Sequence, residues 1–230
     1  MSRMIFNKGL QFEDEIIITE SQIDFEIIDA KTVVDEKYKN CSHASHCMIY
    51  SPTDFPILNV FKSRAIILMQ LRFDGHIGFP GGVVDAGENV EEALNRELSE
   101  EMDIPASVMM EIEDRKFIHY NKKRSLLLHF FIKQVSPELL RNIELRSTKA
   151  LEYGNEVLGV LRVPLYTMGD GYRGFPAFLQ NKFIGNAKYQ LIESLKLLNI
   201  MSVEEIEKAL NPERLHSPAI VENLPEDITG

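Results

Sequence analysis

Patterns of hydrophobic and polar residues divide the chain into expected strands and helices. ASHCMIY (residues 44–50) and RAIILMQLRF (64–73) are typical of strands, and EVLGVLRVPLY (156–166) predicts another. RKFIHY (115–120) and SLLLHFFIKQV (125–135) flank the basic turn NKKR, a pattern that predicts a β-hairpin.

Helical periodicity marks three further segments. Residues 89–102 predict one helix, and residues 185–198 predict a second, with Ala187, Leu191, Leu195 and Leu198 on its apolar face. Ser202 and Glu205 form a capping-box pattern for a short helix that ends before Pro212. Near the start of the chain, IIIT (16–19), FEII (25–28) and KTVV (31–34) resemble short strands or edge pieces, although runs this brief do not separate strand from helix.

Alternating strands and helices predict an α+β fold with one main domain. We place this domain at residues 41–200. Residues 1–40 are expected to form an N-terminal extension that packs on or precedes the core. Residues 201–230 are expected to form a short helix and an acidic flexible tail, because the chain from Asn211 onward has three prolines and no periodicity.

Composition narrows the class of protein. The 230 residues carry a net charge of −10 with 44% hydrophobic residues, which is typical of a soluble globular domain and argues against coating nucleic acid by bulk charge. We find no apolar run of the roughly 18 residues that a membrane span needs and no secretory signal. Cys41 and Cys47 are the only cysteines, too few for a disulfide framework. We therefore expect a cytosolic or nuclear protein that does not enter membranes.

Three carboxylates gather in one turn of the helix expected at residues 89–102. The buried side of that helix is marked by Val90, Ala93, Leu94 and Leu98, whereas Met102 is expected to point mostly away from it. With Glu97 at zero, Glu101 lies at about +40° and Glu100 at about −60°, on the inward half.

The ordinary interpretation of such a charge run is a solvated helix face. Inward carboxylates argue against it, because they repel one another and lose hydration unless a cation lies between them. Hard oxygen ligands favour Mg²⁺ or Mn²⁺ over zinc, and Mg²⁺ commonly binds phosphate oxygens as well. The pattern therefore predicts phosphate chemistry.

Residues upstream of the carboxylates complete a known motif. Gly82, Glu88 and the run RELSEEMDI (96–104) resemble the Nudix box. Asp103 departs from it, because the family usually has glycine just after the helix, but Asp tolerates the left-handed conformation better than most residues. We expect Arg96 to orient the loop by pairing with a carboxylate such as Glu88.

A closer resemblance covers the chain from about His43 to Leu198. The segments AIILMQLRFDGHIGFPGG, LNRELSEEM, EVLGVLRVPLYT and FIGNAKYQLIESL are similar to the snoRNA-decapping, inosine-diphosphate-hydrolysing branch of the Nudix hydrolases. This resemblance implies an α/β/α Nudix sandwich with a mixed sheet, a homodimer, and a Mg²⁺- or Mn²⁺-dependent enzyme that cleaves purine nucleoside diphosphates and the caps of RNA. It also implies a location in the nucleus, including nucleolus and nucleoplasm, and in the cytoplasm.

The same resemblance assigns roles to individual residues. It implies metal binding by Glu97, Glu100, Glu101, the carbonyl of Gly81, and Glu193, and substrate binding by His46, Arg72, Phe79 and Gln190. The spacing of Asn186, Gln190 and Glu193 supports a polar stripe that leans over the site, although a plain solvated face fits equally well. Phe79 is expected to stack on a purine, Gln190 to bind its edge and Arg72 to hold a phosphate.

Several alternatives stay open at this stage. A zinc cluster of Cys41, His43, His46 and Cys47 is disfavoured, because neighbouring residues of a strand point to opposite faces. His119 and His129 fit structural roles, although His119 could accept a proton near the phosphates. Glu100 is a candidate general base, but coupled carboxylates do not separate base from ligand.

The function itself has three alternatives: a nucleotide hydrolase, an RNA-decapping hydrolase that uses the NKKR turn for RNA, or a catalytically weak Nudix-fold binding or scaffold protein.

Overall fold

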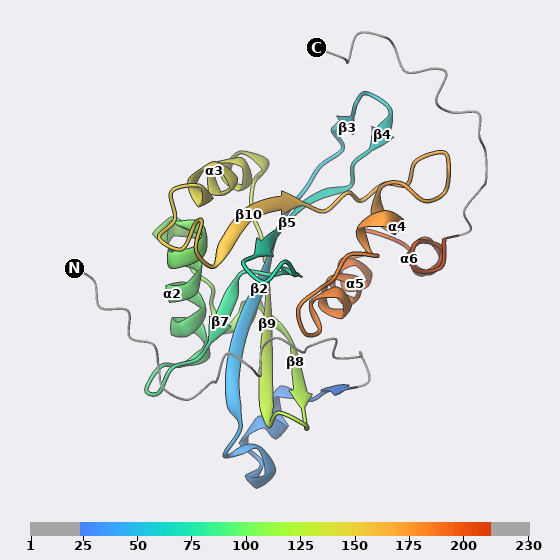
Figure 1. Cartoon of the computed structure of the whole chain (residues 1–230). Coiled ribbons are helices and arrows are strands. Elements are labelled where there is room, and N and C mark those ends of the chain that lie inside the picture. Colours follow the sequence, from blue (N-terminus) through green and yellow to red (C-terminus); the bar gives the residue numbers. More distant parts are fainter. Residues whose placement is uncertain (1–23, 213–230) are drawn as a thin grey trace.

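A mixed β-sheet lies at the centre of the protein, in a computed structural model that describes residues 24–212 (Figure 1). Its strands follow the order β1-β8-β9-β2-β5-β10, with β6 beside β5 and β7 beside β2. Only β2 and β9 pair in parallel among these strands, so the predicted mixed sheet is confirmed for the described residues. The strand bounds are β1 (Phe25–Ile27), β2 (Ser42–Pro52), β5 (Ala65–Arg72), β6 (Ile77–Gly78), β7 (Gly81–Val83), β8 (Arg115–Asn121), β9 (Leu126–Gln134) and β10 (Val157–Arg162).

Helices cover both faces of this sheet (Figure 1). One layer holds α2 (Val90–Met102) and α3 (Pro137–Ser147), and the other holds α4 (Phe175–Phe178), α5 (Ala187–Leu197) and α6 (Val203–Leu210). Shorter pieces are the 3₁₀ helices η2 (Ala30–Val34), η3 (Glu36–Tyr38), η4 (Ala106–Val108) and η5 (Ile112–Asp114) and the hairpin of β3 (Pro56–Ile57) and β4 (Phe61–Lys62). No helix among the described residues is long and apolar enough to cross a membrane.

Side-chain alternation along β2 divides the core into two layers. Cys47 and Ile49 belong to the cluster that packs under α2 and α3, whereas Met48 and Tyr50 belong to the cluster that packs under α5 and α6. Because consecutive strand residues face opposite sides, one strand supplies both layers of an α/β/α sandwich.

Local capping signals fix the helix ends where the sequence predicted them. Asn89 and Glu92 form a capping box at the start of α2, and Ser202 and Glu205 form one at the start of α6. Asp103 ends α2 in the left-handed region (φ 49°), as its residue type allowed.

Some sequence-based expectations need correction. FEII does contain an edge strand, β1, but KTVV is the 3₁₀ helix η2, because the Asp29 side chain accepts a hydrogen bond from the Lys31 N–H and starts a helical turn. Met102 is fully buried rather than outward, because it packs in one cluster with Leu140 and Ile143 of α3, a helix that our sequence analysis missed. IIIT and the tail beyond Pro212 lie outside the described residues.

Candidate functional site

The C-terminal turn of α2 contacts β7 through a buried carboxylate. The backbone N–H of Gly81 donates a 2.8 Å hydrogen bond to Oε2 of Glu101, which is only 3% exposed. Gly81 has φ +130°, and a Cβ there would lie 2.1 Å from the carbonyl oxygen of Ser45. Only glycine therefore lets β7 pair closely with β2 and present its N–H to Glu101.

The second carboxylate, that of Glu97, lies beneath the neighbouring glycine. A Cβ on Gly82 would come within 2.5 Å of Oε1 of Glu97. The side chain of Glu97 is 16% exposed and that of Glu100 is 38% exposed. The predicted inward orientation is therefore confirmed for Glu97 and Glu101, while Glu100 lies at the rim.

Arg96 connects three acidic side chains around this turn. Its Nε donates to Oε1 of Glu88 at 2.9 Å, which is the expected pairing. Its Nη1 donates to Glu97 at 2.8 Å and to Glu100 at 3.3 Å. A single guanidinium thus fixes the loop before α2 to the carboxylates on α2.

Burial and mutual repulsion raise the pKa values of Glu97 and Glu101. Burial, together with the charges of Glu97 and Glu156, raises the pKa of Glu101 to about 8, although the Gly81 N–H and the charge of Arg72 oppose the shift. Burial also raises the pKa of Glu97, although the adjacent Arg96 opposes the shift. The site therefore favours a bound positive charge.

Glu156 is an acidic neighbour that our sequence analysis did not assign to the site. The loop before β10 approaches α2 because the Glu152 N–H donates to the carbonyl oxygen of Glu100 at 2.9 Å. The charge of Glu156 acts on both Glu97 and Glu101. A lone Glu before a strand gives no spacing signal, so only the folded chain reveals this proximity.

The donor chemistry of this cluster suits a hard divalent cation. Carboxylate oxygens of Glu97, Glu100 and Glu101 and the nearby Gly81 carbonyl are all-oxygen donors with an excess of negative charge. Arg96 donates hydrogen bonds to oxygens of Glu97 and Glu100. Within residues 24–212, no three Asp, Glu, His or Cys side chains are arranged to coordinate a metal ion. An ion would therefore have to compete with Arg96 for these oxygens.

His46 and Arg72, two of the expected substrate-binding residues, adjoin this cluster. His46 pairs with Gly81 across β2 and β7, and burial, together with the charge of Arg72, lowers its pKa to about 4. His46 is therefore a neutral hydrogen-bonding group at pH 7. The charge of Arg72 also lowers the pKa of Glu101, so the same guanidinium influences both His46 and the carboxylates. The Nε of Arg72 lies 3.3 Å from Oδ2 of Asp74.

Phe79, the expected stacking residue, lies in the core. Its ring packs edge-on against Phe130 with centroids 5.0 Å apart, and only 4% of the residue is exposed. Stacking of Phe79 on a purine stays a prediction, because in this arrangement its ring faces protein.

The polar stripe of α5 turns inward rather than toward solvent. Asn186 and Gln190 are buried, and Nδ2 of Asn186 and Nε2 of Gln190 have no hydrogen-bond partner among the described residues. Both ring nitrogens of buried His119 are likewise unpaired, and its ring lies 5.6 Å from that of Tyr189 on α5. Glu193 instead pairs with Lys196 at 2.9 Å, so its metal-binding role stays a prediction.

The cysteine and histidine residues near the start of β2 do not assemble a zinc site in the described chain. Nδ1 of His43 lies 2.9 Å from Nε2 of His129, and Cys47 is buried in the cluster under α2, on the face opposite His46. The expectation from strand alternation therefore agrees with the structure.

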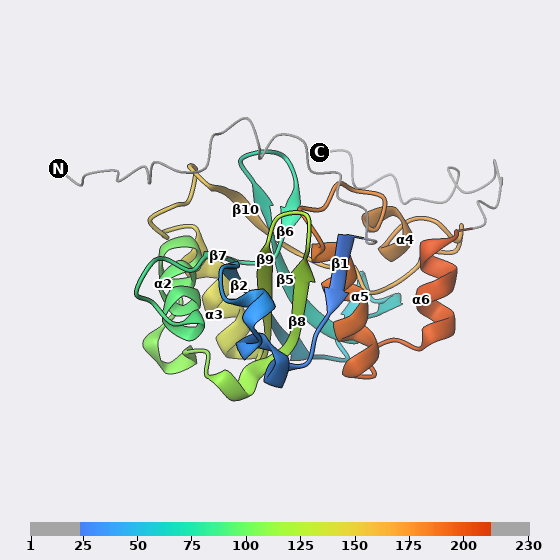
Figure 2. The same ribbon diagram turned by 90° about the horizontal axis from the view of Figure 1, so that it is seen from below.

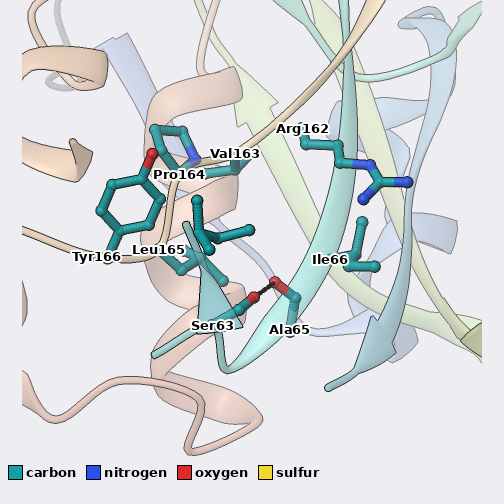
Figure 3. Close-up of a pocket in the computed structure, with 9 residues that line it drawn as sticks. Ser63, Ala65, Ile66, Arg162, Val163, Pro164, Leu165 and Tyr166 are labelled. Carbon is teal, nitrogen blue, oxygen red and sulfur yellow. Dashed lines mark hydrogen bonds between the residues drawn. The ribbon is translucent and has the colours of Figure 1, made fainter. Parts of the chain in front are cut away.

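A small cavity of about 130 Å³ opens beside the end of β10 (Figure 3). Ser63, Ala65, Ile66 and residues 162–166 line it, and the Ser63 hydroxyl donates to the carbonyl oxygen of Ala65 at 3.4 Å. Arg162 at its edge is paired with Glu144. None of the candidate site residues lines this cavity, so we assign it no chemistry.

Comparisons with known proteins place the chain among close relatives. Residues 43–201 match the family model described as "Nudt16-like: U8 snoRNA-decapping enzyme-like". A U8 snoRNA-decapping enzyme from Homalodisca vitripennis is 49% identical over 157 residues, which are 68% of this chain and 84% of that protein. The mouse U8 snoRNA-decapping enzyme is 40% identical over 173 residues, 74% of this chain and 89% of that protein.

Two more distant similarities complete the comparison. The human Tudor-interacting repair regulator protein is 37% identical over 170 residues, 74% of this chain and 80% of that protein. A solved MutT/nudix family protein from Enterococcus faecalis is 13% identical to this chain, with a TM-score of 0.46. The structural match covers 75% of this chain and 68% of that protein's chain.

Proposed function

This chain belongs to the Nudt16-like family of Nudix hydrolases, and we propose that it hydrolyses phosphoanhydride bonds in purine nucleoside diphosphates and in the 5′ caps of RNA, with Mg²⁺ or Mn²⁺ as cofactor. The single observation that carries this proposal is the crowded set of carboxylates on α2, in which Glu101 is buried and has its pKa raised to about 8. Such a set is stable in its ionised form only beside a cation, and phosphate substrates commonly complete the shell of Mg²⁺.

In this proposal, Glu97, Glu100, Glu101 and the Gly81 carbonyl hold the ion, with Glu193 as a further ligand. The ion, when bound, neutralises charge that develops on the phosphate oxygens. Water attacks a phosphorus atom of the diphosphate or cap bridge, its oxygen bonds to that phosphorus, and the bridging P–O bond breaks toward the leaving phosphate. Glu100, the most exposed of the three α2 carboxylates, accepts the proton of the water.

The buried amides of α5 favour a 6-oxopurine such as inosine. Nε2 of Gln190 and Nδ2 of Asn186 are donors without a partner among residues 24–212, and buried polar groups without partners are costly unless a ligand binds them. The O6 and N7 atoms of hypoxanthine are acceptors, whereas adenine presents an amino group at position 6. Neutral His46 and the guanidinium of Arg72 would then bind the remainder of the nucleotide.

Capped RNA is the second substrate class in this proposal. Lys122, Lys123 and Arg124 form an exposed basic turn between β8 and β9, on an otherwise acidic protein. Because contacts with backbone phosphates release counterions, RNA binding through this turn would weaken steeply with salt, whereas nucleotide hydrolysis would change less.

A binding or scaffold role is the alternative. Its support is the 37% identity to the human Tudor-interacting repair regulator protein. The complete set of Glu97, Glu100 and Glu101 favours catalysis instead.

The experiment that tests the proposal uses the purified full chain with inosine diphosphate and, separately, capped RNA, each with and without Mn²⁺. Release of phosphate and of the cap nucleotide is scored. Metal-dependent cleavage of both substrates supports the full proposal, and cleavage of one restricts it to that substrate. If neither substrate is cleaved, the binding role replaces it.

From the family relationship we also propose a homodimer and a location in nucleus and cytoplasm. Sedimentation velocity tests the first and imaging of the tagged chain tests the second. A monomer at micromolar concentration would overturn the dimer.

A further inference from the structure

The edge strand β1 precedes the part of the chain that matches the family model, yet it joins the sheet beside α5 (Figure 2). It pairs antiparallel with β8, with Phe25 opposite Asn121, Glu26 opposite Tyr120 and Ile27 opposite His119. The N-terminal extension therefore adds a strand next to the buried His119, whose ring nitrogens have no partner within the described part of the chain.

Strand alternation decides which side chains of β1 face α5. The His119 ring lies 5.6 Å from that of Tyr189 on α5, and directly opposed residues of antiparallel strands share a face. Phe25 and Ile27 therefore face α5 as well. Glu26 faces the other side with Tyr120, whose ring packs at 4.9 Å on Tyr38.

A close contact places the Phe25 ring at the start of α5. A Cβ on Gly185 would lie 3.9 Å from Cζ of Phe25, and Gly185 directly precedes Asn186, the N-cap of α5. Phe25 is half-buried.

Gly78 lies between this loop and Arg72. A Cβ on Gly78 would lie 2.8 Å from Ile184 and 3.3 Å from Cδ of Arg72. Gly78 and residues 184–186 thus lie between Arg72, the expected phosphate-binding residue, and Phe25. The side-chain amides of Asn186, at the N-cap of α5, and of Gln190, within α5, have no hydrogen-bond partner among the described residues.

We propose that β1 forms the outer wall of the base pocket and that the Phe25 ring packs against the purine of the bound nucleotide. An aromatic face suits a flat base, and the unpaired amides of α5 would hold the edge of the same base. Phe25 thereby determines affinity for the nucleoside and leaves the chemical step unchanged. This inference rests on the proposed function.

Fluorescence tests the proposal directly, because the chain contains no tryptophan. Phe25→Trp introduces a sole indole at the proposed wall, and Val34→Trp, at a residue 88% exposed on η2, is the matched control. Inosine diphosphate is titrated in EDTA, where no turnover is expected. We expect a saturable change in F25W fluorescence, with the dissociation constant that calorimetry gives, and no change in V34W.

Kinetics supply a second readout. Phe25→Ala should raise KM for inosine diphosphate about tenfold with kcat within about twofold, F25W should restore KM, and Glu26→Gln, on the opposite face of β1, should match wild type. An unchanged KM in F25A, or a silent F25W while calorimetry reports binding, overturns this inference alone. A wild-type chain that neither binds nor cleaves inosine diphosphate overturns the proposed function together with it.

Discussion

The backbone N–H of Gly81 and the carboxylate of Glu101 are joined by a 2.8 Å hydrogen bond that connects β7 to the last turn of α2. This bond holds in place a side chain whose ionisation is opposed by burial. The strand and the helix of the candidate site are therefore positioned by each other.

Glu101→Gln should abolish hydrolysis and leave the fold intact. Gln keeps an oxygen for the Gly81 N–H but removes the negative charge, so we expect a loss of at least about 100-fold in kcat. Because the folded pKa of Glu101 is about 8, its contribution to stability is present below the unfolded pKa near 4.5 and is lost as pH rises through 8. E101Q should therefore melt at or above the wild-type temperature at pH 8 in EDTA. Normal activity in this variant would contradict the metal assignment.

Gly82→Ala should inactivate the enzyme without unfolding it. The new Cβ would collide with the Glu97 carboxylate, the flexible end of a side chain, which can move aside at small cost to the fold. Displacing it by about 1 Å should reduce kcat/KM about 100-fold. Gly81→Ala is the contrast, because its Cβ meets backbone at a positive φ and should destabilise the fold. Circular dichroism and turnover separate the two; a fully active G82A would argue that Glu97 is dispensable.

Arg96→Lys should weaken activity through position rather than charge. Lys cannot contact Glu88, Glu97 and Glu100 at once as the guanidinium does, so we expect a loss on the order of 10- to 100-fold in activity or metal affinity. Arg162→Lys, which alters a comparable pair with Glu144, is the control and should retain wild-type turnover. Equal activity in both variants would show that Arg96 does not position the carboxylates.

His129→Gln should reduce the acid sensitivity of the fold. Burial, together with the charges of His43 and Arg115, lowers the pKa of His129 to about 3. Between about pH 6.5 and 3, His129 is therefore protonated in the unfolded chain but not in the folded chain, and the free energy of unfolding decreases as pH falls through this range. Near pH 5 the slope of unfolding free energy against pH should drop by about 1.4 kcal/mol per pH unit. Urea unfolding at pH 4.5 to 6 measures it, and an unchanged slope would mean that His129 titrates normally.

The sequence by itself determined the local features of the site. Helical periodicity predicted α2 and the inward side of Glu97 and Glu101, and residue type allowed the left-handed Asp103. The pairing of Arg96 with Glu88 was expected from the motif that contains both residues. These features depend on residues within about two helical turns, where chain geometry alone brings groups together.

The tertiary structure alone decided the rest. The burial of Met102 required α3, and the unpaired amide of Gln190 required the packing of α5 against the sheet. Glu156 joins the carboxylates only because a distant loop bonds to the Glu100 carbonyl. Such contacts join residues far apart in sequence, and neither residue type nor spacing encodes them, because they are fixed by which surfaces bury together when the layers close.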